Sequence, residues 1–246
     1  MKYMQCRVVG MMGGFPAKDA PCSGYLIEQD GFKLLLDCGS GVAQGLQQYV
    51  DINEIDHVVL SHYHYDHYSD VGVMLFARLV NTMLEKADRP LTIYGLESEE
   101  MKRRVEEVPH SKFVPYDERS VLQIGPFQVE FQKNIHPVET CAIKVSTDEK
   151  SIVYTADTSF TEDLVELAKG TDLLISECSF YEGLDGTSSG HMNAQEVGIL
   201  AEKSGAKEVL LSHLPHYGDW NDLVVSARAQ GNENIRLAEV GLHVKI

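Results

Sequence analysis

The order of strand-like and helix-like segments predicts an α/β protein, with two β-sheets packed face to face and helices outside them. Short apolar segments with strand character dominate both halves of the 246-residue chain, and amphipathic segments separate them. No linker, low-complexity tract or fixed-period repeat interrupts this pattern, so we predict one domain over residues 1–246.

The first half begins with a strand-like segment and a predicted β-hairpin. Its two strands, 25–29 and 32–37, flank Asp30-Gly31, a two-residue pair typical of hairpin turns. In chain order, the expected elements are then a helix over 41–50, a buried strand over 57–61, a long helix over 71–87, a strand over 91–95 and an exposed, charged helix over 98–108.

The second half repeats this style. Strands are expected over 121–125, 126–132, 141–147 and 151–157, with a tight turn at 148–150. A helix over 161–170 starts at a Thr cap and stops at a Gly. The remaining elements are a buried strand over 172–178, a helix over 194–205, a strand over 207–213, a helix over 221–231 and a final segment over 235–246.

The composition excludes several classes of protein. No apolar run approaches the ~20 residues that a membrane helix needs, and the N-terminus lacks a signal-peptide layout, so we expect a cytoplasmic location. The five cysteines are scattered, odd in number and never in a CxxC pair, which predicts small buried side chains rather than a disulfide framework.

A formal net charge of -16 disfavours a long polyanion as the main partner, because nucleic-acid binders usually present a basic patch. The one basic cluster, Lys102-Arg103-Arg104, lies among four glutamates. We interpret it as the solvated face of a helix, so no broad basic surface is expected.

The informative residues are histidines and aspartates that directly follow predicted strands. His62, His64, Asp66 and His67 lie within six residues after the strand over 57–61. Imidazole and carboxylate groups are the ligands that zinc favours, and manganese or iron tolerates the same set. His136, Asp157 and His213 also come at strand ends, so four strand ends present metal-type ligands.

The segment SHYHYDH matches the HxHxDH signature of the metallo-β-lactamase fold, and the later order His, Asp, His matches as well. The chain therefore resembles this superfamily from FKLLLDCGSG to SHLPHYGD. The resemblance implies a four-layer αββα sandwich with two divalent metal ions. It implies that one metal is held by His62, His64 and His136, that the second is held by Asp66, His67 and His213, and that Asp157 bridges them. Asp37 matches the family's early Asp, which supports the histidine loop without binding the metals itself.

Within the superfamily, the segment SSGHMNAQEVGILAEKSGAKEVLLSHLPHY resembles that of ribonuclease Z, where a His-x-x-Ala stretch opens a helix. By this match His191 is the proton donor to the leaving oxygen, and Glu196 could orient it. The preceding loop, 186–190, offers backbone NH groups and hydroxyls for a phosphate oxygen.

Departures from other branches narrow the expectation. Asp157 stands where β-lactamases often have Cys, and His64 stands where flavodiiron reductases have Glu. The tRNA-gripping arm of ribonuclease Z is missing between His136 and Asp157, and the family's Arg after the last His is replaced in the sequence 213–217. Processing of tRNA is thus an open question.

These features predict a dinuclear metal-dependent hydrolase, in first place a phosphodiesterase that acts on a nucleotide-type diester or an RNA end. Two metals favour this chemistry because they activate water and stabilise the phosphoryl group. Asp66, beside that water, could accept its proton, and His191 would protonate the leaving group.

Two alternatives stay open at this point. A carboxylic ester, thioester or lactone hydrolase could use the same metals but would not need His191. A non-catalytic metal-binding protein is the third class. The resemblance implies a homodimer, to which the apolar helix over 71–87 could contribute an interface, although burial within the monomer explains that helix equally well.

Overall fold

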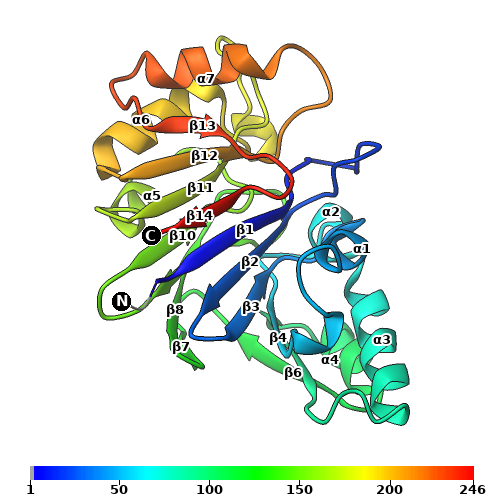
Figure 1. Ribbon diagram of the computed structural model, residues 1–246. Helices are drawn as coiled ribbons and strands as arrows, with labels where there is room; N and C mark the ends of the chain where they lie inside the picture. Colours follow the sequence, from blue (N-terminus) through cyan, green and yellow to red (C-terminus); the bar gives the residue numbers. More distant parts are fainter. Residues whose placement is uncertain (1–2) are drawn as a thin grey trace. The chain divides into compact units, whose positions relative to one another are not determined.

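The computed structural model describes residues 3–246 and contains two compact units. The first unit comprises the described residues up to Asp117 together with Val240–Lys245, and the second comprises Glu118–Glu239. Each unit contains one seven-stranded sheet with helices beside it (Figure 1).

The sheet of the first unit has the strand order β14-β1-β2-β3-β4-β5-β6. Its strands are β1 Gln5–Gly10, β2 Gly24–Gln29, β3 Phe32–Leu36, β4 His57–Val59, β5 Leu91–Leu96, β6 Ser111–Tyr116 and β14 His243–Lys245. The strands from β14 to β3 pair antiparallel, and those from β3 to β6 pair parallel. The predicted hairpin is confirmed as β2–β3, with positive φ at Asp30 and Gly31.

Helices cover one face of this sheet. They are α1 Val42–Leu46, the 3-10 turn η1 Ile52–Glu54, α2 Tyr65–Tyr68, α3 Val71–Met83 and α4 Glu99–Glu106. Apolar side chains of α1, α3 and α4 share one buried cluster with side chains of β1 to β6. Helix α1 is shorter than the expected 41–50, because it starts at Gly41 without a side-chain cap and has Gly45 in its interior.

Helix α3 has two different apolar faces. Val71, Met74 and Leu75 are buried, whereas the opposite face exposes Val73, Phe76, Val80 and Met83. Burial within the monomer therefore accounts for one face of this helix, and the use of the exposed face as a homodimer interface stays a prediction.

The sheet of the second unit has the order β13-β12-β11-β10-β9-β8-β7. Its strands are β7 Val121–Ile124, β8 Phe127–Lys133, β9 Cys141–Ser146, β10 Ser151–Tyr154, β11 Leu173–Glu177, β12 Glu208–Ser212 and β13 Ile235–Leu237. The strands from β7 to β10 pair antiparallel, and those from β10 to β13 pair parallel. Every residue of the interior strand β11 is buried, as is usual for strands of a parallel sheet.

The helices of the second unit are α5 Glu162–Leu167, the 3-10 turn η2 Thr187–Ser189, α6 Ala194–Ser204 and α7 Trp220–Arg228. Helix α6 contacts both α5 and α7. It begins with a capping box, in which Asn193 and Glu196 each accept from the other's backbone NH.

Two further predictions can be compared with residues 3–246. All five cysteines are buried, and within residues 3–246 none forms a disulfide, as predicted. In this part of the chain, no helix combines the length and the apolar character that a membrane span requires.

Candidate metal centre

In the first unit, the parallel pairing of β3 with β4 places Asp37 beside the start of the histidine loop. Asp37 follows β3, and its backbone NH donates to Val59 at the end of β4. Its buried carboxylate accepts from the backbone NH of Ser61 at 2.7 Å and from the Ser61 hydroxyl at 2.8 Å. The prediction that Asp37 supports the loop is confirmed.

The loop after β4 gathers the three histidines of the HxHxDH motif. The ring centroids of His62 and His64 are 4.8 Å apart, and those of His62 and His67 are 4.1 Å apart. His62 and His67 are fully buried. Such close, buried imidazoles repel one another if protonated, so the cluster favours neutral rings that can bind a cation.

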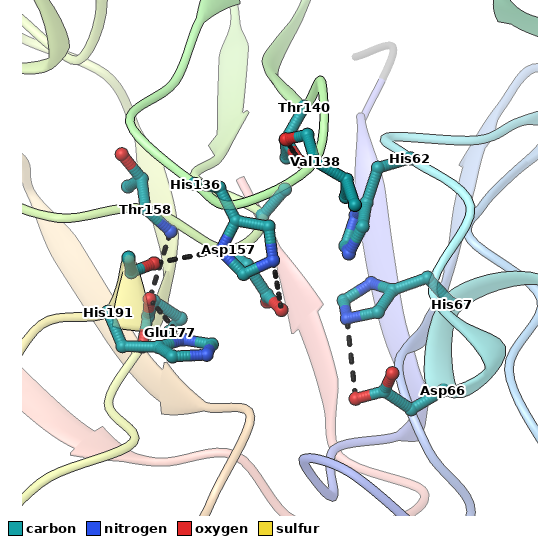
Figure 2. Close-up of polar contacts among 12 residues, drawn as sticks. His62, Asp66, His67, His136, Val138, Thr140, Asp157, Thr158, Glu177 and His191 are labelled. Carbon is teal, nitrogen blue, oxygen red and sulfur yellow. Dashed lines mark hydrogen bonds and ion pairs between the residues drawn. The ribbon is translucent and has the colours of Figure 1, made fainter. Parts of the chain in front are cut away.

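Asp66 supplies the carboxylate of this set. Its Oδ2 accepts from the backbone NH of Gly14 at 2.6 Å and lies 3.6 Å from His67 Nε2 (Figure 2). The first unit therefore brings together its four predicted ligands.

In the second unit, the carboxyl ends of three adjacent parallel strands carry the functional side chains. Asp157 follows β10, Glu177 ends β11, and His213 follows β12. Ligands gather at such strand ends because loops leave a parallel sheet there side by side. Asp157 and Glu177 are almost fully buried.

Asp157 lies between two histidines of this unit. Its Oδ2 is 3.8 Å from His136 Nε2 (Figure 2). Its Oδ1 is 3.4 Å from His213 Nε2. His136 is placed by the segment after β8, where the Asn134 side chain donates to the backbone carbonyls of Thr155 and Asp157. The two oxygens of one carboxylate thus face two different imidazoles, as a bridging ligand requires.

Hydrogen bonds fix which ring nitrogen each histidine presents. The Ser61 hydroxyl donates to Asp37, so its oxygen accepts from His62 Nδ1 at 3.0 Å. His67 Nδ1 donates to Asp37 at 2.7 Å, and His136 Nδ1 donates to the Gly190 carbonyl at 3.0 Å. With the proton on Nδ1, Nε2 carries the lone pair in all three rings, and this arrangement is typical of metal-binding histidines.

In His213 as well, a hydrogen bond places the proton on Nδ1, and here the partner is Ser179. The Ser179 hydroxyl donates to Glu177 Oε2 at 2.6 Å and therefore accepts from His213 Nδ1 at 2.9 Å. Nε2 of His213, the atom nearest Asp157, is left as the ligand atom. The donor set and its tautomers fit divalent metal ions.

Glu177 also orients His191. Its Oε1 accepts from His191 Nδ1 at 2.9 Å and from the backbone NH of Thr158 at 2.9 Å. The rings of His191 and His213 stack at 5.4 Å, and Glu177, His191 and His213 offer ligand-type atoms within 4.8 Å of one another. The buried Glu177 carboxylate thus fixes the orientation of the His191 ring.

The suggestion that Glu196 orients His191 is therefore wrong. Glu196 accepts from the backbone NH of Asn193 at 2.9 Å and serves the cap of α6. Sequence reasoning missed Glu177 and Ser179 in this role. The available signal was a carboxylate at the end of the buried strand over 172–178, next to strands that end in other candidate ligands.

In the loop over 186–190, several of the groups predicted to bind a phosphate oxygen already have partners in or beside the loop. The backbone NH groups of Ser189, Gly190 and His191 all donate to carbonyls of the same loop, and that of Thr187 donates to the Asp185 carboxylate. The Ser189 hydroxyl donates to the Gly186 carbonyl. The loop instead positions His136, through the Gly190 carbonyl.

Comparisons with known proteins identify the family of the chain. The model of the metallo-beta-lactamase superfamily matches residues 17–236. The probable metallo-hydrolase YhfI of Bacillus subtilis is 42% identical over 239 residues, which are 97% of this chain and 98% of that protein. The crystal structure of YhfI superposes with a TM-score of 0.96 over 99% of both chains.

More distant structures share the fold. The short form of human tRNase Z has a TM-score of 0.78 at 18% identity and covers 98% of both chains. A diphosphatase from the PhnP family has a TM-score of 0.77 at 18% identity, over 100% of this chain and 98% of that one.

Proposed function

The chain belongs to the metallo-β-lactamase superfamily of metallo-hydrolases, and from this premise we propose that it is a two-metal phosphodiesterase acting on a nucleotide-type diester or an RNA end. The membership confirms the predicted α/β fold class. Hydrolase chemistry with divalent metal ions follows from the family and the donor set. The bond that is cleaved and the substrate belong to the proposal.

We assign the ligands as the sequence predicts. One metal would be held by His62, His64 and His136, the other by Asp66, His67 and His213, and Asp157 would be shared between them. The fixed Nε2 lone pairs of His62, His67, His136 and His213 support this assignment. Zinc is the first candidate, with manganese or iron as alternatives.

The chain's own groups complete the reaction. When bound, two divalent cations lower the pKa of a shared water and neutralise charge on the phosphoryl oxygens. Asp66 would take the proton of the attacking water; its Oδ2 accepts from the backbone NH of Gly14 and lies 3.6 Å from His67 Nε2. His191 would give a proton to the departing alkoxide, and its ring is oriented for this by the hydrogen bond from its Nδ1 to Glu177.

The His191–Glu177 pair is the observation that carries a phosphodiesterase over an ester or lactone hydrolase. An alkoxide is a strongly basic and therefore poor leaving group, so its departure needs a positioned acid. The buried Glu177 carboxylate orients His191 for this role. The relatives named tRNase Z and diphosphatase agree with phosphorus–oxygen chemistry.

The test is hydrolysis of bis(p-nitrophenyl) phosphate beside a simple lactone, with the metal-loaded enzyme. We expect diester cleavage that is lost after chelation and returns with zinc or manganese, at two metals per chain by elemental analysis. His191→Ala should lower kcat on a diester with an alkoxide leaving group by about 10²- to 10⁴-fold. His243→Ala, a histidine on β14 whose ring bonds Gln5, is the matched control and should retain activity.

Two outcomes contradict the proposal. Lactone turnover without diester cleavage would assign the acyl-hydrolase alternative. Full activity of His191→Ala on the alkoxide diester would remove the proton-donor role.

A homodimer is part of the proposal for partners. The exposed apolar face of α3 supports it, because Val73, Phe76, Val80 and Met83 form a stripe without a charged side chain. Chromatography with light scattering measures the mass directly, and a 27.4 kDa species would contradict it.

A further inference from the structure

A groove in the first unit begins one residue away from the candidate ligand Asp66. It has a volume of about 460 Å³ and is lined by residues of α2, the start of α3, and α4. This volume is within the range of roughly 300–1,000 Å³ that is usual for small-molecule sites. Neither the ligand assignment nor the proton donor uses it.

The floor of the groove is apolar and rigid. Val71 and Leu75 of α3 and Met101 and Val105 of α4 line it, and all four are buried. These side chains also belong to the buried cluster of the sheet. A flat apolar group would therefore meet a preformed surface.

One wall is an ordered series of tyrosine rings. The Tyr63 hydroxyl donates to the Leu96 carbonyl, and the Tyr68 ring packs edge-on against Tyr63 at 6.0 Å. Tyr65 stacks on Tyr68 at 5.7 Å with an angle of 19° between the rings, and 76% of Tyr65 is exposed. The series thus ends in the Tyr65 ring, which packs against Tyr68 on one face and is otherwise exposed to solvent.

The other wall carries charged groups of both signs. Arg104 and Glu107 line it, and the Arg104 guanidinium holds only an exposed ion pair with Glu100 at 2.8 Å. Such surface pairs are weak, so the guanidinium can turn to a ligand at little cost. Arg104 then offers donors and Glu107 an acceptor to the edge of a planar ring.

We propose that this groove binds the nucleobase of the substrate, with the base stacked on Tyr65 and its polar edge bonded by Arg104 and Glu107. A base combines an aromatic face with donors and acceptors in its plane, which is the combination that these walls recognise. The inference rests on the proposed function, because it gives the nucleotide-type diester a place for its base.

The experiment compares adenosine 5′-monophosphate with ribose 5-phosphate, which lacks the base, by calorimetry on the metal-loaded protein. We expect the nucleotide to bind at least tenfold more tightly. Tyr65→Ala should weaken nucleotide binding by about 5- to 150-fold, the usual range for loss of one base–aromatic stack, and leave ribose 5-phosphate unchanged.

Arg104→Ala is the second variant, since it lies on α4 and far in sequence from the histidine loop. It should reduce the preference for the nucleotide in the same direction. Phe76→Ala removes an exposed aromatic ring of α3 that does not line the groove, and it should change nothing.

Photolabelling with 8-azidoadenosine 5′-monophosphate locates the base independently. Label on the peptides around 63–72 or 99–108 supports the groove. Label confined to other peptides would overturn the proposal. So would equal affinity for adenosine 5′-monophosphate and ribose 5-phosphate. The proposal is also overturned if Tyr65→Ala and Arg104→Ala dissociate a dimer but keep the preference for the nucleotide. Failure of diester hydrolysis refutes the proposed function instead, because the binding measurement needs no turnover.

Discussion

Glu177 connects His191, the proposed proton donor, with His213, a proposed metal ligand. Through its two oxygens it holds His191 directly and His213 by way of Ser179. We expect Glu177→Gln to lower kcat on bis(p-nitrophenyl) phosphate by about 10- to 100-fold, the usual effect of removing an outer partner of a ligand. Steady-state kinetics with the metal-loaded variant measure this effect.

Glu196→Gln is the control for that change. A glutamine keeps the reciprocal cap with Asn193, so stability and kcat should stay near those of the parent. A large loss in Glu196→Gln with little in Glu177→Gln would reverse the assignment made from the structure.

These two glutamates show which site residues can be predicted from the sequence and which cannot. The histidine cluster can be predicted because its ligands lie within six residues, and Asp37 can be predicted because it matches a motif. Glu196 is close to His191 in sequence but lies at the first turn of a helix that needs a cap. Glu177 is 14 residues away and becomes a neighbour only when β11 pairs with β10 and β12.

His57, at the start of β4, predicts a pH effect on stability. Burial lowers its pKa below the usual value of 6.5, Asp56 opposes this shift, and Arg89 and Arg78 add to it. Its ring stacks on Phe32 at 5.0 Å. Because the folded-state pKa is below the unfolded one, the unfolded chain binds the proton first as the pH falls.

The contribution of His57 to the free energy of unfolding is therefore favourable above about pH 6.5. It is lost as the pH falls toward the folded-state pKa of His57. We expect the urea midpoint to decrease between pH 7.5 and 5 by less in His57→Gln than in the parent. An identical decrease in both proteins would show that other groups account for the pH dependence.

At the scale of elements, Arg78 attaches α3 to the segment before β4. The guanidinium is 3% exposed, donates to Asp56 at 2.9 Å and also reaches the carbonyls of Arg89 and Ile55 at 2.7 Å each. Loss of one partner of a buried ion pair costs about 3–5 kcal/mol. Asp56 keeps Arg89 at 2.9 Å, so we expect Arg78→Met to lose about 3 kcal/mol.

Urea denaturation measures this loss, with Arg103→Met on the exposed face of α4 as the control. The control should stay within about 0.5 kcal/mol of the parent. A similar small change for Arg78→Met would mean that the methionine packs in place of the ion pair at no cost.

Element prediction succeeded where the apolar pattern was regular. The strands around Asp30-Gly31 and the capped helix after Thr161 are examples. Strand β6 was missed, because Pro115 and the mixed polar pattern over 111–116 do not look like a strand. The proline is tolerated since β6 is the edge strand of its sheet.

At the scale of the whole molecule, the two units repeat one plan of an antiparallel meander joined to parallel strands. The repeated alternation of strands and helices predicts this plan, because parallel strands need crossover connections. The single-domain prediction for 1–246 concerns the relation between the units and stays a prediction.

The net charge of -16 favours a small substrate over a polymeric one. A long RNA meets the repulsive field of the whole protein, whereas a small diester carries one charge to one site. Raising the salt from about 10 mM to about 150 mM shortens the Debye length from about 30 Å to about 8 Å.

We therefore expect kcat/KM for a 3′-extended tRNA precursor to rise about tenfold or more over this range, and that for bis(p-nitrophenyl) phosphate to change less than about twofold. Repulsion would be relieved by screening only for the polymer. A fall in kcat/KM with salt for the precursor would reveal a basic RNA-binding surface and would make tRNA the natural substrate.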